Sequence, residues 1–125
     1  MVATANVRLP AWIAKARAAA LALCATTRGV RGAKHFVYVA LMEDARRTCR
    51  FGLYVGETSR DPDLRFDQHK SGYKASRFVH RFGVLLLPDL VAHLNPLRRW
   101  EAKELEPALA EEFRRVGVPW VEGGH

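Results

Sequence analysis

Tyr38 and Tyr54 are followed along the chain by Arg65, His69 and several glutamates. The side chains of these residues are suited to proton transfer and ion binding. Tyr38 and Tyr54 lie in apolar stretches, and Arg65 and His69 are four residues apart, so in a helix they share one face. A guanidinium is always protonated and can bind two phosphate oxygens at once. A phenol, whose ordinary pKa is near 10, acts as a base only where a cation lowers that pKa. Taken singly, each residue also has a simpler role, as a packed strand aromatic or a solvated helix charge.

Two strands and a helix must position these residues. His35–Met42 and Phe51–Val55 are rich in β-branched and aromatic residues, which predicts two strands joined by the polar run 43–50. Asp61 is an N-cap acceptor, Pro62 suits the first helical position, and Gly72 suits the position after a helix. We therefore expect a helix over 61–71.

Further elements are expected on either side of this segment. Pro10 and the alanine-rich stretch 11–25 predict a first helix that packs through small residues, and 26–34 is typical of a linker. A short helix is expected over 74–81, then a third strand over 83–87 that is buried on both faces because its apolar residues do not alternate.

The last part of the chain predicts a long helix. Asn95-Pro96 repeats the cap-and-proline signal, and the pattern runs to Val116 with Gly117 after it. Pro107 removes one helical hydrogen bond, so a kink is expected near Glu106. Residues 118–121 could add an edge strand, a position that tolerates proline.

The composition indicates a folded chain with an anionic partner. Apolar residues make up 49% of the 125 residues and charged residues 26%, as in globular proteins. Twenty Lys and Arg against thirteen Asp and Glu give a formal net charge of +7. Nucleic acid is the partner that this charge favours, and a basic protein without such a partner is the alternative.

Cysteine spacing and hydropathy favour a cytoplasmic protein that does not interact with membranes. Cys24 and Cys49 have no second Cys or His at metal-ligand spacing, so we expect two reduced thiols that act as small apolar side chains. No apolar run approaches the roughly 20 residues that span a bilayer. The stretch 18–25 lacks the cleavage site of a signal peptide.

Four short motifs, in this order, resemble the GIY-YIG nuclease family. They are Val37-Tyr38-Val39, Tyr54-Val55-Gly56-Glu57-Thr58, the stretch 64–72 with its Arg-x-x-x-His-x-x-Gly pattern, and Glu101-Ala102-Lys103-Glu104-Leu105-Glu106. The resemblance spans residues 36–106, well over half of the chain. It implies an α/β (α+β) fold with a small three-stranded mixed sheet flanked by helices. Residues 35–125 would form this GIY-YIG-like nuclease domain, and residues 1–34 an N-terminal helical extension and linker.

The resemblance also implies an activity: an endonuclease that hydrolyses phosphodiester bonds in nucleic acid, DNA before RNA, with one Mg²⁺ or Mn²⁺ ion. Such hydrolysis needs a nucleophilic water, a charge that neutralises the pentacoordinate phosphorus, and help for the departing oxygen. On the family pattern Tyr54 or Tyr38 activates the water and Arg65 neutralises the phosphate. His69 binds a tyrosine hydroxyl or the phosphate, and Glu106 holds the metal.

Two glutamates compete for the role of metal ligand. The family motif favours Glu106, whereas the apolar stripe of a straight helix would place Glu101 nearer its middle. The expected kink at Pro107 makes that stripe a poor guide, so Glu106 is preferred and Glu101 is the alternative.

A basic segment follows the second strand and is expected to contact backbone phosphates. Its basic residues alternate with Phe66, Tyr73 and Phe78. Besides Arg65, they are Arg60, Lys70, Lys74, Arg77 and Arg81. The alternative function is a noncatalytic nucleic-acid-binding module on the same scaffold. An enzyme for small phosphorylated metabolites would need a glycine-rich phosphate loop, which the sequence lacks. The N-terminal helix is expected to cover the sheet or to meet a second subunit of a homodimer.

Overall fold

The computed structural model describes residues 8–72 and 76–124. The elements follow one another as α2 (Ile13–Leu21), β1 (Phe36–Glu43), β2 (Phe51–Thr58), α3 (Pro62–Ser71), α4 (Arg77–Phe82), β3 (Gly83–Leu86), the 3-10 turn η1 (Pro88–Leu90), α5 (Arg99–Arg115) and β4 (Val121–Gly123). The expected mixture of helices and strands is confirmed. Lys74 lies outside the described residues. Within the two described ranges, no helix has the length and apolar character needed to cross a membrane.

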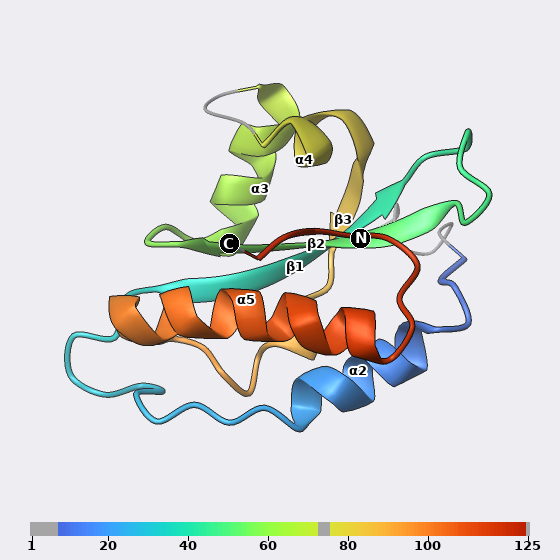
Figure 1. Cartoon of the computed structure of the whole chain (residues 1–125). Helices are drawn as coiled ribbons and strands as arrows, with labels where there is room; N and C mark the ends of the chain where they lie inside the picture. The colour runs from blue at the N-terminus through green and yellow to red at the C-terminus, as the bar shows by residue number, and fades with distance from the viewer. Residues whose placement is uncertain (1–7, 73–75, 125) are drawn as a thin grey trace.

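The sheet has four strands in the order β3-β1-β2-β4, so the expectation of three strands is wrong. β1 runs antiparallel to β2 and to β3, whereas β4 runs parallel to β2. The extra strand is the edge strand that the C-terminal sequence allowed, formed by Val121–Gly123 rather than by 118–121. In Figure 1, α3 and α4 lie on one side of the sheet, and α5 and α2 lie on the other.

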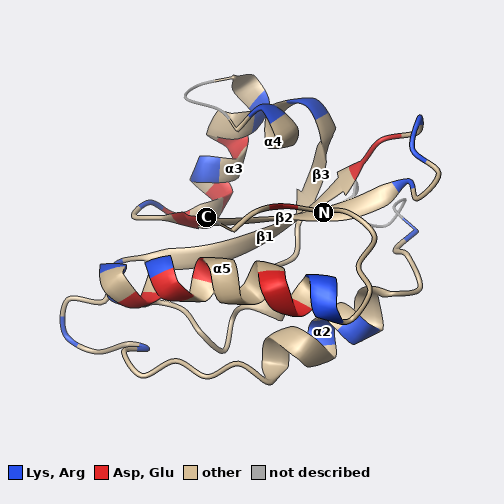
Figure 2. Cartoon of the chain, in the orientation of Figure 1, with Lys and Arg blue, Asp and Glu red and all other residues tan. Residues whose placement is uncertain are grey.

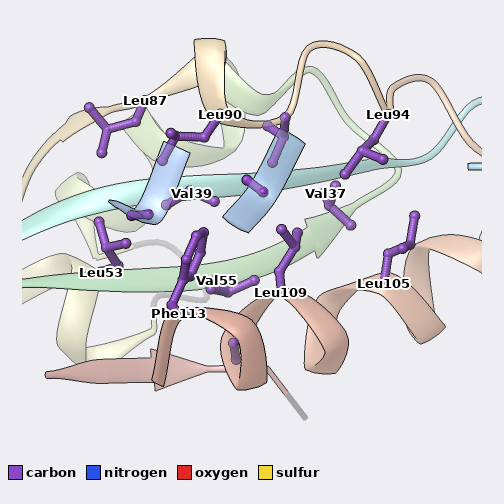
Figure 3. Close-up of a cluster of buried hydrophobic side chains, with 14 of the residues drawn as sticks. Val37, Val39, Leu53, Val55, Leu87, Leu90, Leu94, Leu105, Leu109 and Phe113 are labelled. Carbon is purple, nitrogen blue, oxygen red and sulfur yellow. The ribbon is translucent and has the colours of Figure 1, made fainter. Parts of the chain in front are cut away.

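The hydrophobic core lies between the sheet and α5. Because side chains alternate along a strand, Val37 and Val39 of β1 and Leu53 and Val55 of β2 all face this helix. Figure 3 shows these valines and leucines packed against α5 and against the segment that follows β3. The core-facing side chains of those two parts are Leu105, Leu109 and Phe113, and Leu87, Leu90 and Leu94. The apolar face of the sheet is therefore covered, and the opposite face is left to α3 and α4.

Two expectations about burial are wrong. β3 is an edge strand and its residues 84–86 are only half-buried, since it pairs with β1 alone, whereas β1 is buried over all but its two ends. Cys24 and Cys49 are both exposed and unbonded, because the first follows α2 and the second lies in the loop between β1 and β2. Neither thiol acts as an apolar core side chain.

The first helix is shorter than the expected 11–25. α2 packs against α5 through Ala16, Ala19 and Ala20, which are buried, so the expected small-residue contact is confirmed. The chain leaves the helix after Leu21, Leu23 and Ala25 pack against the core, and Thr26 and Thr27 then bind Glu101 in the first turn of α5.

α5 begins at Arg99, three residues later than the Asn95-Pro96 signal predicts. The Asn95 side chain does not cap the helix, because its amide pairs with β1: Val37 N–H donates to Asn95 Oδ1 (2.9 Å), and Asn95 Nδ2 donates to the Val37 carbonyl (2.8 Å). The N-cap residue is Arg98, and no side chain of the described residues caps the helix; the Arg98 N–H instead donates to the hydroxyl oxygen of the distant Thr27 at 2.9 Å. The helix then continues through Pro107 to Arg115.

Glu101 completes this junction and is not available to a metal. Its carboxylate accepts hydrogen bonds from the backbone N–H and the hydroxyl of both Thr26 and Thr27, at 2.7–3.0 Å. Burial alone would raise its pKa, but these donated hydrogen bonds hold the pKa down at about 2. A carboxylate has about four lone-pair positions, so this set of donors fills them.

Replacing Glu101→Gln should lower the free energy of unfolding by about 2–3 kcal/mol, because an amide N–H₂ would face backbone donors that have lost their acceptor. Urea unfolding at neutral pH measures the change. Glu104→Gln, at an exposed position one turn along the same helix, is the matched control and should change stability by less than about 0.5 kcal/mol. Equal stability of the two variants would contradict the role of Glu101.

Candidate active site

The two tyrosines meet because each faces a small residue across the β1–β2 ladder. In this register Tyr38 is opposite Gly56, and Ala40 is opposite Tyr54. The tyrosines are therefore diagonal neighbours on one face, a distance that aromatic side chains can bridge. Their ring centroids are 6.1 Å apart. This is the face away from the hydrophobic core.

Gly56 provides the space for the Tyr38 ring. A Cβ atom at position 56 would lie 2.5 Å from the Tyr38 Oη and 2.8 Å from its Cε1, closer than any side chain can tolerate. Gly56 is needed because it has no side chain and not because of its backbone conformation, since its φ is not in the left-handed region. It lets the phenol lie flat across β2 and reach the next layer.

That next layer is α3, which ends where the sequence predicted. Asp61 caps it by accepting from Asp63 N–H (2.8 Å) and Leu64 N–H (3.4 Å), Pro62 occupies the first turn, and Gly72 ends it at φ +91°. His69 and Arg65 lie one turn apart, as expected. Both tyrosine rings are 6.3 Å from the His69 ring.

Hydrogen bonds define the protonation state of His69. Its Nδ1 accepts from the Ser76 backbone N–H at 2.8 Å, so the ring proton of the neutral form is on Nε2, which faces the Tyr38 hydroxyl at 3.4 Å. Burial and the nearby Arg65 charge lower the His69 pKa to about 4. At neutral pH His69 is therefore an uncharged donor to Tyr38.

Tyr38 responds to every charged group of the candidate site. Burial raises its pKa the most, Tyr54 and the negative charge of Glu106 raise it further, and the Arg65 guanidinium lowers it. The side chain is only 4% exposed, and that of Glu106 is 9% exposed. The Arg65 and Glu106 charges thus both act on the phenol, although the two residues come from α3 and α5, on opposite sides of the sheet. β4 pairs with β2 only as far as Val55. Among the described residues, no strand therefore covers the outer edge of β2 beyond that point.

A basic cavity opens beside this cluster, with a volume of about 580 Å³. Arg65 and Gln68 line it from α3, Arg60 from the end of β2, and Arg99 and Lys103 from α5. Arg65 Nη1 donates to Gln68 Oε1 at 3.2 Å, and Lys103 pairs with Glu57 at 3.2 Å across the cavity. Figure 2 shows Lys and Arg gathered where α5 begins and on the neighbouring loops. The cavity's basic lining suits an anion, and Arg65, which lines the cavity, also acts on Tyr38.

The structure brings together most of the residues that the sequence singled out, though not all of them. Tyr38, Tyr54 and His69 are in contact, and Arg65 joins them to the cavity. Of the basic segment, Arg60 lines the cavity, whereas Lys70, Arg77 and Arg81 are exposed on α3 and α4 outside it.

Sequence reasoning missed other residues of the site. Arg99 and Lys103 line the cavity, but on the sequence Lys103 looked like a partner for neighbouring glutamates. The sequence signal that could have found them is their spacing of four, which places both on one face at the start of a helix. His35 and Gln68 also line the cavity, and Ser76 orients His69 through its backbone, for which no side-chain pattern exists.

Glu106 is the carboxylate that could hold a metal here. Over residues 8–72 and 76–124, no group of three or more His, Cys, Asp or Glu side chains could do so. Magnesium commonly takes one or two carboxylates and completes its shell with waters and substrate oxygens. One buried carboxylate whose charge acts on Tyr38 fits that pattern, whereas Glu101 is committed to Thr26 and Thr27.

Comparisons of this chain with protein-family models, with curated proteins and with solved structures find no match.

The low pKa of His69 predicts a pH dependence of stability. Since its pKa of about 4 is below the ordinary 6.5, folding favours the neutral ring, so this contribution is full above pH 6.5 and is lost as the pH falls to about 4. The loss should reach roughly 3 kcal/mol. Urea midpoints measured between pH 7 and about 4 should fall steeply for the unaltered chain and less steeply for His69→Gln. Parallel curves for the two proteins would show that His69 is not held neutral.

Proposed function

We propose that this chain is a metal-dependent endonuclease of the GIY-YIG kind, which hydrolyses phosphodiester bonds in nucleic acid, with DNA as the first candidate. The observation that carries the proposal is the contact of Tyr38, Tyr54 and His69 beside a basic cavity that Arg65 shares. The order of hairpin, helix and glutamate-bearing helix also agrees with the family resemblance. β4 would then be an addition to a three-stranded family core.

Tyr54 is the better candidate for taking the proton from water. His69 Nε2–H donates to the Tyr38 oxygen, and a hydrogen bond between Tyr38 and Tyr54 raises the Tyr38 pKa, as expected when Tyr38 is the donor. The donors then run in one direction, from His69 through Tyr38 to Tyr54. Tyr38 is buried and keeps its proton, so its role is to position Tyr54.

The cavity supplies the binding site for the phosphate. Arg60, Arg65, Arg99 and Lys103 face it, against the single carboxylate of Glu57. The Gln68 contact holds the Arg65 fork, which suits bidentate binding of two phosphate oxygens. Positive charge aimed at the phosphate stabilises the transition state, in which negative charge builds up on its oxygens.

Glu106 would hold a divalent cation, Mg²⁺ or Mn²⁺. Such an ion would supply Lewis-acid polarisation of the phosphate and favour ionisation of water nearby. The protein's part is to bury this carboxylate, which is 9% exposed and whose charge acts on Tyr38. A cation there would also offset the negative charge that raises the Tyr38 pKa.

Replacing Glu106→Gln should abolish Mg²⁺- or Mn²⁺-dependent nicking of a supercoiled plasmid while leaving salt-sensitive DNA binding nearly unchanged. Glu111→Gln, at an exposed position on the same helix, is the matched control and should keep full cleavage. If the unaltered protein binds DNA but cuts neither DNA nor RNA with either metal, the noncatalytic binding module replaces this proposal.

Removing only the hydroxyl should lower the cleavage rate by different factors at the two tyrosines. Tyr54→Phe should lower the single-turnover cleavage rate by roughly 10²- to 10⁴-fold, the usual contribution of a general base. Tyr38→Phe should cost clearly less, because Tyr54 keeps its own hydroxyl. The rate constants with saturating metal measure both effects, and circular dichroism checks that each variant folds. A larger loss for Tyr38→Phe would reverse the assignment.

A further inference from the structure

A second basic cavity adjoins the candidate active site and contains an exposed tryptophan. Its volume is about 700 Å³, and it lies between the start of α5 and the loop that precedes β1. Its principal lining residues are Lys34, His35, Arg98, Arg99, Trp100 and Lys103. Nothing in the proposed hydrolysis uses Trp100.

Trp100 is exposed where the other tryptophans are not. Its side chain is 53% exposed, whereas Trp120 is buried and Trp12 packs against the core. An indole on the surface leaves a large apolar face in water, which is unfavourable unless a ligand covers it. Flat aromatic faces next to cations are the common platform for nucleobases, because every base has a face that can stack.

The charge around Trp100 suits a phosphate backbone. Lys34, Arg98, Arg99 and Lys103 line this cavity, and no Asp or Glu of residues 8–72 and 76–124 does so. Arg98 Nη2 donates to the Arg31 carbonyl at 2.7 Å, which ties the loop to the helix. Together with the bonds of Glu101 to Thr26 and Thr27, this contact holds both walls in place before any ligand binds.

The two cavities share one wall. His35, Arg99 and Lys103 line both of them, and Arg65 is on the far side of the first. A chain with alternating phosphates and flat rings could therefore pass from Trp100, over Arg99 and Lys103, to Arg65.

We propose that this second cavity binds an unpaired nucleotide strand, with one base stacked on Trp100 and its neighbouring phosphates on Arg99 and Lys103. A duplex keeps its base faces covered by adjacent bases, so it cannot use this platform, and a single strand can. The proposal rests on the proposed function in that the same strand continues to Arg65. It makes the preferred substrate a nucleic acid with a single-stranded segment beside the scissile phosphate.

The test measures binding without metal, so that no cleavage occurs. A labelled oligothymidine of about 12 nucleotides, the matching oligouridine and a duplex of equal length are titrated with the full chain and followed by fluorescence anisotropy. Trp100→Ala should weaken single-strand binding by roughly 5- to 150-fold, the value of one stacked base, and change duplex binding by less than twofold. Trp100→Phe should restore part of the loss.

The controls separate this proposal from the nuclease proposal. Leu21→Ala removes an apolar side chain at the end of α2 that is as exposed as Trp100. It should change neither the single-strand nor the duplex affinity. A loss with Trp100→Ala that is equal for single strand and duplex, or no loss at all, overturns the inference even if the protein cleaves DNA. A selective loss supports it even if no cleavage is ever seen. Comparison of the thymidine and uridine probes shows whether the bound strand is DNA or RNA.

Discussion

The candidate site depends on the close approach of the Tyr38 ring to Gly56. Only a residue without a side chain can stand opposite this phenol, and the residue opposite Tyr54 is the small Ala40. Both rings can then occupy one face of a two-stranded ladder as diagonal neighbours. A shift of the register by one residue would turn the tyrosines into the hydrophobic core and the valines toward α3. The same alternation therefore positions the chemistry and builds the core.

The two faces of the sheet are held by different interactions. On the α5 side, aliphatic side chains and Phe113 are fully buried, and this packing supplies most of the stability. On the other side, His69 is the buried residue of α3, and its bonds are polar, to Tyr38 and to Ser76. Little apolar area therefore holds α3 in place. Segments of that kind open more readily than the core, and this is common where a ligand must enter.

Local signals explain which elements could be predicted. The signals for the caps of α3 and for the two strands of the hairpin lie in adjacent residues. The structure has the caps at the predicted residues and both strands in the predicted segments, although β2 continues to Thr58. The start of α5 could not be predicted, because Asn95 binds Val37 and does not cap the helix, and the N-cap residue Arg98 is held by Thr27, seventy-one positions away. The basic cavity depends in the same way on contacts between β2, α3 and α5, so Arg99 and Lys103 had no signal beyond their spacing.

The choice between Glu101 and Glu106 shows what spacing can and cannot decide. Five residues turn a helix by about 140° from alignment, so the two side chains meet different neighbours. Both carboxylates are nevertheless buried, and burial requires only that each has a partner. The sequence does not say whether that partner is a loop, an arginine or a metal. Here the loop partner of Glu101 fills its lone pairs and holds one wall of the second cavity. Glu106 acts on Tyr38 instead. One helix thus supplies a structural carboxylate, Glu101, and a candidate metal ligand, Glu106. The role of each follows from its neighbours and not from its position in the motif.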